Sequence, residues 1–282
     1  MSDSVDISNL PKFSVVLNVY KNNRWESINA ALMSLLDQLV RPSEILVISD
    51  GPSDVTFAWD SIFSFAGEMN VLIRLIELPV NLGLADSRNI GVDACSTEYI
   101  FNMDADDLCR PTRFQSSLPV LVDGADFVSS YIVEVDRFSG GFLKVRECVV
   151  GLVDRFPSNF VVSPINHVTL GYRRTTFESI GGYSSRRFLE DLELVGRMLL
   201  YRVNLIGIAD VLVEVNVDDI EARRSGYIYF AEEVALLWRF YRSGLITFSQ
   251  AMLGCSVRAL IRFSRIGLKI SRYFSRKKCI EY

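Results

Sequence analysis

Residues 81–107 read NLGLADSRNIGVDACSTEYIFNMDADD, and this stretch decides the fold. Asn81 and Gly83 have loop chemistry, residues 85–94 follow as a short helix, and residues 98–103 form an apolar strand that ends at DADD. A helix that leads into a buried strand is half of a βαβ unit. The stretch therefore predicts an α/β fold with carboxylates at the end of a strand.

The chain before residue 81 repeats this alternation. Strand-like runs cover residues 13–20, 44–49 and 71–78, and helical spacing of apolar residues covers 24–39 and 57–65. Short strands separated by helices of about ten to fifteen residues predict a mainly parallel sheet that helices cover on both faces.

Polar residues follow three of the predicted strands. Asn18 and Tyr20 end the first strand, Asp50 ends the second, and residues 104–107 end the fourth. Open parallel sheets bind ligands outside the carboxyl ends of their strands. We therefore expect an active-site crevice at this edge.

Composition excludes several classes of protein. The 282 residues are 49% apolar and 23% charged, which predicts a globular core and excludes wholesale disorder. The five cysteines are scattered without a CxxC pair, which predicts reduced thiols and no zinc site. An acidic, polar amino terminus and the lack of an apolar run of about 18 residues predict a cytoplasmic chain without a membrane span.

Charge is distributed unevenly along the chain. Residues 252–282 carry a net charge of +7, and residues 1–251 carry −11. An acidic body repels phosphate polymers, so we expect no nucleic-acid partner.

The acidic cluster after the fourth strand predicts a metal site. Neither GxGxxG nor GxxxxGK[ST] occurs, so the chain lacks both common phosphate-binding loops. Carboxylates at Asp104, Asp106 and Asp107 would repel a diphosphate unless Mn²⁺ or Mg²⁺ lay between them. The alternative is a solvated acidic turn that caps the helix beginning near Pro111.

Four segments together resemble the family 2 glycosyltransferases with a GT-A fold. They are SVVLNVYKN, EILVISDGPSD, the 81–107 stretch and GGYSSRRFLEDLELVGRML, and the resemblance covers roughly residues 13–215. The 163–174 segment, SPINHVTLGYRR, resembles the subset that builds bacterial surface polysaccharides such as O-antigen and capsule. The resemblance implies a domain at 1–215 with a nucleotide-binding half at 13–107 and an acceptor-binding half at 108–215. The charge of the remaining sequence predicts a basic helical extension at 216–282.

The resemblance also implies roles for the edge residues. Asp50 would receive the nucleobase, Tyr20 would line its pocket, and Arg88 would reach toward the base. Asp104 would face the ribose, and Asp106 would hold the metal.

Three positions depart from the family pattern. Asn18, another candidate for nucleotide binding, stands where proline is common. Ser49 stands where many members have aspartate, and Ser87 where alanine is usual. These departures affect the base pocket and not the metal.

Transfer with inversion also needs a carboxylate that takes the proton of the acceptor hydroxyl. Glu190 and Asp191 open an amphipathic helix after a Gly-Gly turn, and the resemblance selects Asp191 as this catalytic base. The alternative is that Asp191 caps the helix.

His167, the single histidine, has two interpretations. It is either a hydrogen-bonded structural residue or a contact to the donor or acceptor. Asp107 and Glu190 are further candidates for contacts with the donor or acceptor.

The carboxyl-terminal segment predicts a membrane-associated helix. Basic residues step by four and three positions, which places them on one stripe of a helix. They are Arg258, Arg262, Arg265, Lys269, Arg272 and Arg276. We expect residues 252–278 to bind an anionic membrane surface, or alternatively to pack on the acidic body with the cations paired. Residues 227–241 predict a second amphipathic helix.

These features predict an inverting, metal-dependent hexosyltransferase on the cytoplasmic face of the cell membrane. It would use a nucleotide sugar, with UDP the common donor nucleotide of the resembled family, and a polyprenyl-diphosphate-linked glycan acceptor. One alternative is a nucleotidyltransferase, although VYKNNRWES lacks the expected glycine-rich loop. The other is a non-catalytic, membrane-bound sugar-nucleotide-binding protein, although DADD and ED are both intact.

Overall fold

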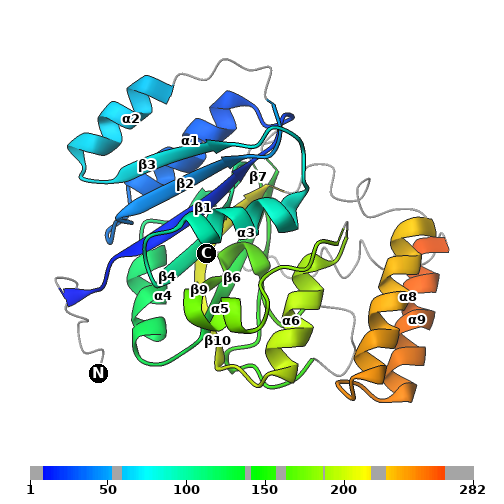
Figure 1. Ribbon diagram of the computed structural model, residues 1–282. Helices are drawn as coiled ribbons and strands as arrows, with labels where there is room; N and C mark the ends of the chain where they lie inside the picture. Colours follow the sequence, from blue (N-terminus) through cyan, green and yellow to red (C-terminus); the bar gives the residue numbers. More distant parts are fainter. Residues whose placement is uncertain are drawn as a thin grey trace.

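The computed structural model describes residues 9–52, 59–136, 141–156, 163–186, 188–216 and 227–263. Within them one sheet runs in the order β3-β2-β1-β4-β9-β6-β10-β5, with β7 added to β6 and β8 added to β10 (Figure 1). Helices lie on both faces of this sheet. The predicted α/β class, a mixed and mainly parallel sheet flanked by helices, is confirmed.

The amino-terminal half is the predicted parallel unit. Its strands are β1 (Phe13–Val19), β2 (Glu44–Ser49), β3 (Leu72–Glu77) and β4 (Tyr99–Asp104), and all their mutual pairings are parallel. Its helices are α1 (Trp25–Leu36), α2 (Trp59–Glu68) and α3 (Leu84–Ala94). All seven residues of β1 are buried, because helices cover it on both sides. The predicted strands and helices of this half are confirmed within one to three residues at most described ends.

The second half makes the sheet mixed. It contains β5 (Leu108–Cys109), α4 (Arg113–Val122), β6 (Phe127–Asp136), β7 (Gly141–Arg146), β8 (Gly151–Leu152), η2 (His167–Thr169), β9 (Gly171–Arg173), α5 (Arg174–Ser179), α6 (Glu190–Leu200) and β10 (Leu205–Asn216). Strand β9 is antiparallel to both β4 and β6, and so joins the two halves into one sheet. Gly171 makes this join possible, because a Cβ there would lie 2.2 Å from the Phe101 ring.

Two cores lie on opposite faces of the sheet. One contains apolar residues of α1, α2 and α4, and the other contains residues of α3, α5 and α6. The second core continues into the carboxyl-terminal helices through Leu236, Leu237 and Phe240.

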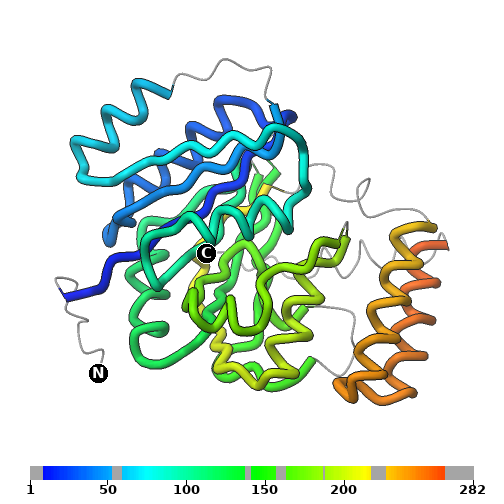
Figure 2. The backbone as a smooth tube through the Cα atoms, in the orientation of Figure 1, coloured from blue at the N-terminus to red at the C-terminus, as the bar shows by residue number. Residues whose placement is uncertain are grey.

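The carboxyl-terminal helices α8 (Tyr227–Arg242) and α9 (Phe248–Phe263) form a hairpin beside α6 (Figure 2). The predicted helix at 227–241 is confirmed. Gly196 of α6 lets α8 approach closely, since a Cβ at this position would lie 2.2 Å from the Phe240 ring. The predicted basic helix begins four residues earlier than expected, and its part from 264 to 278 lies outside the described residues. None of the described helices has the length and apolarity needed to span a membrane.

Candidate active site

The carboxyl ends of β1, β2 and β4 meet at one edge, as predicted. Asn18 of β1 lies in register with Ile48 of β2 and Asp104 of β4. Burial raises the pKa of the Tyr20 hydroxyl, which remains protonated, and the charges of Arg88 and Asp104 act on it as well. The structure therefore brings the predicted nucleotide-binding residues together.

Asp50 fixes the loop that precedes α3. Its carboxylate accepts the backbone N–H groups of Leu82 (2.7 Å) and Gly83 (3.0 Å) and the side-chain amide of Asn81 (3.1 Å). Gly83 takes a φ of 89°, a conformation that favours glycine. Asp50 thus has a structural role that the sequence did not reveal, and its contact with a nucleobase stays a prediction.

Arg88 is directed at Asp104. The Nη2–Oδ1 distance is 2.5 Å, and the Arg88 side chain is 2% exposed whereas that of Asp104 is 35% exposed. Burial lowers and the Asp104 carboxylate raises the pKa of Arg88, and the net shift is upward. The ion pair holds the carboxylate predicted to face the ribose, while the expected reach of Arg88 toward the base stays a prediction.

The carboxylates of the DADD turn differ in their exposure to solvent. Asp107 is buried, and its Oδ1 accepts the backbone N–H of Asn216 at the end of β10 (3.0 Å). Asp106 lies in the turn and is partly exposed. The turn does not cap α4, because the N-cap of that helix is Thr112, so the capping alternative is wrong.

The donor set at this turn suits a hard divalent cation. Mg²⁺ and Mn²⁺ take carboxylate oxygens, and Mg²⁺ needs only one or two from the protein when phosphates complete its coordination. Asp106 and the exposed part of Asp104 provide such oxygens. Three converging His, Cys, Asp or Glu side chains, which a fully protein-built site would need, are not found in the described part of the chain.

Helix α6 presents the second carboxylate pair. Its N-cap position is Leu189, with a φ of 62°, so Asp191 does not occupy that position. Asp191 does satisfy one free N–H group of the first turn, as the alternative to a catalytic role expects. One Asp191 oxygen accepts the backbone N–H of Leu192 (2.7 Å). Burial, followed by the charge of Asp191, raises the pKa of Glu190, and the charge of Glu190 also acts on Arg88. Glu190 therefore lies within electrostatic range of Arg88 and of Asp104 at the DADD turn.

Tyr183 connects four parts of the site, and the sequence analysis missed it. Its hydroxyl accepts the side-chain amide of Asn102 (2.7 Å) and shares a hydrogen bond with His167 Nε2 (2.7 Å). Its backbone exchanges two hydrogen bonds with the Asn89 side chain (2.8 and 2.9 Å), and its ring lies 5.6 Å from the Arg88 guanidinium carbon. The sequence signal for Tyr183 is its position directly after the Gly-Gly turn and before the ED pair.

His167 is a neutral member of this network. Burial, with the cation of Arg88, lowers the pKa of His167 from 6.5 to about 3. The imidazole is therefore uncharged near neutral pH, and it acts through its hydrogen bond to Tyr183. The hydrogen bond expected of a structural histidine is present, and a contact of His167 with donor or acceptor stays a prediction.

Two positions that depart from the family pattern contact each other. The side-chain amide of Asn18 donates to the Ser87 hydroxyl (2.9 Å). The third, Ser49, donates to the carbonyl of Gly51 (3.2 Å). All three side chains are buried, so these residues shape the loops around the crevice.

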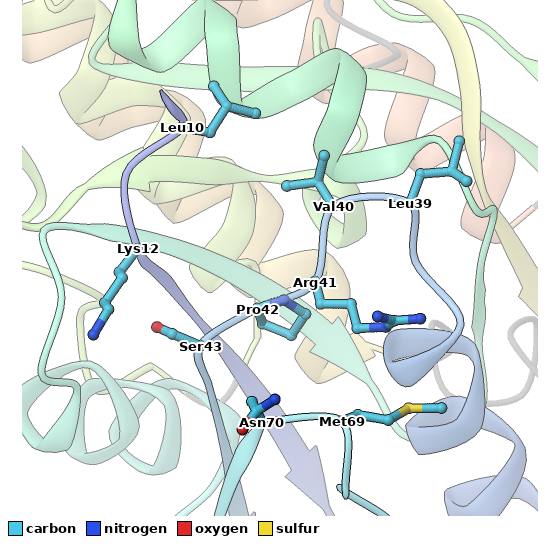
Figure 3. A pocket seen from close by; sticks show the side chains of 9 residues that line it. All are labelled: Leu10, Lys12, Leu39, Val40, Arg41, Pro42, Ser43, Met69 and Asn70. Carbon is cyan, nitrogen blue, oxygen red and sulfur yellow. The ribbon is translucent and has the colours of Figure 1, made fainter. Parts of the chain in front are cut away.

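A hollow of about 330 Å³ lies at the other end of the sheet (Figure 3). Lys12 and Ser43, which line it, directly precede β1 and β2. Because ligands of open α/β sheets bind at the carboxyl ends, this hollow has no part in the predicted chemistry.

Comparison with known proteins identifies the family. Residues 14–179 match the model of glycosyl transferase family 2, so the chain belongs to this family and is a glycosyltransferase. The chain is 27% identical over 263 residues to the UDP-Gal:alpha-D-GlcNAc-diphosphoundecaprenol beta-1,3-galactosyltransferase of Escherichia coli, covering 89% of this chain and 91% of that protein. It is 26% identical over 227 residues to the amylovoran biosynthesis glycosyltransferase AmsE of Erwinia amylovora, covering 79% and 84%.

Solved structures support the GT-A fold. Residues 1–349 of S. aureus TarS in complex with UDP-GlcNAc superpose with a TM-score of 0.65 at 17% identity, over 91% of this chain and 74% of that one. At this identity the likeness concerns the fold.

Proposed function

We propose that this glycosyltransferase is inverting and metal-dependent, and that it moves a sugar from a UDP-sugar to a lipid-linked oligosaccharide during bacterial surface polysaccharide synthesis. One observation carries the proposal: the buried Arg88 pairs with Asp104 at the end of β4, and the charges of both residues also act on Glu190 at the start of α6. The relatives named for a diphosphoundecaprenol-linked acceptor and for amylovoran synthesis support the acceptor class.

The donor would lie along the carboxyl ends of β1, β2 and β4. Tyr20 and Asn18 would line the base pocket, and Asp50 would hold the loop that closes it. Asp104, oriented by Arg88, would accept the ribose hydroxyls. The UDP-galactose of the E. coli relative and the UDP complexes of TarS support a uridine nucleotide.

Asp106, with Asp104, would hold Mn²⁺ or Mg²⁺. When bound, the cation would neutralise the charge that develops on the leaving diphosphate. The protein supplies the rest of the electrostatic environment, in which the fixed ion pair of Arg88 and Asp104 keeps the carboxylate in place.

The reaction needs one proton acceptor on the far side of the sugar. The acceptor hydroxyl oxygen forms the new bond to the anomeric carbon while the bond to the diphosphate breaks, and the hydroxyl proton passes to a carboxylate. We propose that the Asp191 carboxylate accepts this proton. One of its oxygens already accepts the backbone N–H of Leu192. Glu190, with its raised pKa, would bind acceptor hydroxyls beside it.

A lipid-linked acceptor would bring the reaction to the cytoplasmic membrane surface. We keep residues 252–278 as the segment that approaches the bilayer, with one correction. Arg258 and Arg262 pair with Glu233 of α8, so for these two positions the packing alternative is correct.

A donor panel tests the proposal. The full-length protein would be mixed with UDP-, GDP- and dTDP-sugars and with a diphosphate-lipid glycan, with Mn²⁺ or with EDTA, and nucleotide release would be measured. We expect release that needs the acceptor, favours a UDP-sugar and stops in EDTA. Acceptor-independent release would contradict transfer, and full activity in EDTA would contradict the metal.

A further inference from the structure

The outer face of the α8–α9 hairpin is apolar. Six large side chains on it are between 48% and 57% exposed. They are Trp238, Phe248, Met252, Leu253, Leu260 and Phe263. The α9 members recur at helical spacing and so share one side of the helix. Exposed apolar side chains gathered on one face mark a surface that contacts something else.

The charges of α9 lie away from this face. In the described residues of α9 the charged side chains are Arg258 and Arg262, which are 11% and 19% exposed. They lie 3.2 Å and 2.9 Å from the buried Glu233 carboxylate of α8, and Arg262 also stacks on the Tyr229 ring at 4.7 Å. The exposed side of α9 therefore carries no charge in this part of the chain.

Charge decides between a bilayer and a second copy of the chain as the occupant of this face. Arg239 and Arg242 of α8 are exposed, and the sequence from 264 to 282 adds six basic residues against one acidic residue. Two copies facing each other here would bring like charges together, which is destabilising. An anionic lipid surface accepts both apolar side chains and the cations of this part of the chain.

We propose that the outer face of the α8–α9 hairpin inserts into the interfacial layer of an anionic bilayer. This inference rests on the proposed function, because it positions the enzyme for a lipid-linked acceptor. The ion pair of Arg186 with Glu232 (3.3 Å) and the contact of the Phe188 and Tyr229 rings (5.3 Å) tie the start of α6 to α8. Bilayer contact through the hairpin would thus hold the Glu190–Asp191 pair near the lipid surface.

Flotation of the full-length protein with vesicles tests the surface. The vesicles would be phosphatidylcholine with and without an equal amount of phosphatidylglycerol. The test variant is Met252→Glu with Leu253→Glu, and the matched control is Leu72→Glu, an equally exposed leucine (55%) on β3 at the far edge of the sheet. We expect the double variant to lose about tenfold or more of its binding to anionic vesicles, because two leucine-sized side chains no longer insert.

The controls separate the possible failures. Leu72→Glu should float like the wild type, and both variants should keep the wild-type melting temperature and the wild-type turnover with a water-soluble acceptor. Wild-type flotation of the double variant would overturn the inference, as would complete release of the wild type at about 1 M salt, where cation–lipid attraction is screened. A wild-type dimer that the double variant dissociates would show a second copy as the occupant. Loss of all turnover without loss of flotation would instead contradict the proposed function.

Discussion

The carboxyl edge of the sheet and the α8–α9 hairpin use carboxylates differently. At the edge, Asp104 and Asp106 are partly exposed next to a crevice, and Arg88 orients the first of them. In the hairpin, Glu233 is buried and paired with two arginines of α9, and the exposed side of α9 carries large apolar side chains. A carboxylate that solvent can reach at a strand end is available for chemistry, whereas a buried and paired one stabilises the packing.

The largest effect should come from the second carboxylate pair. Asp191→Asn keeps the shape of the side chain and removes its basicity, so we expect turnover to fall by about 10² to 10⁴ with nucleotide binding retained. Glu190→Gln is the matched comparison and should fall less. A larger loss in Glu190→Gln would move the base to Glu190, whose pKa burial already raises.

Asp106→Ala tests the first carboxylate site. We expect turnover to fall by about 10² to 10³, because charge on the leaving diphosphate would no longer be neutralised. Asp107→Asn is the comparison at the same turn, since Asp107 accepts the backbone N–H of Asn216. Its effect should be on thermal stability. Nucleotide release measured across a Mn²⁺ titration would distinguish a weakened metal site in Asp106→Ala from a destabilised fold in Asp107→Asn. An unchanged Mn²⁺ dependence in Asp106→Ala would exclude a metal role for Asp106.

Glu233→Gln tests the hairpin. It leaves Arg258 and Arg262 mostly buried without their carboxylate, so we expect a loss of about 1–3 kcal/mol in the free energy of unfolding. The neighbouring Glu232→Gln removes a more exposed ion pair with Arg186 and should cost well under about 1 kcal/mol. Urea unfolding followed by circular dichroism measures both. Equal losses would show that the burial of Glu233 does not matter.

At neutral pH the smallest effect should come from His167, where a substitution acts mainly on the pH dependence of stability. His167 has a pKa of about 3 in the folded chain and 6.5 as its ordinary value, so below pH 6.5 the unfolded chain binds a proton that the folded chain does not. Falling pH therefore favours unfolding between 6.5 and 3. His167→Gln should make this slope shallower by at most about 1.4 kcal/mol per pH unit. If urea titrations across this range gave His167→Gln the wild-type slope, the folded chain would not hold His167 neutral.

Local pattern predicted much of the fold. The strands of the first half were recognised because apolar runs of strand length alternate with helical spacing, and each lies within two residues of its predicted bounds. The second half was harder, since β9 has three residues and β5 and β8 have two, too short for periodicity to appear.

The candidate site was predicted only in part. Asp50 and Asp104 were placed at one edge because carboxyl ends of parallel strands meet there. The connection of Tyr183 to Asn102 and His167 was missed, because its partners are 81 and 16 residues away along the chain. The N-cap position itself is Leu189, whose backbone lies in the left-handed region, and Asp191 satisfies a free N–H group from within the first turn of the helix.

The sequence by itself determined the alternation of strands and helices, the acidic turn after β4, the family and the excess of cations near the carboxyl end. Only the tertiary structure decided which charged groups are already paired. Asp107 is held by Asn216, and Arg258 and Arg262 by Glu233, across 109, 25 and 29 residues. The physical reason is that burying a charge costs free energy unless the charge is paired. Which groups become buried together depends on how distant segments of the chain pack.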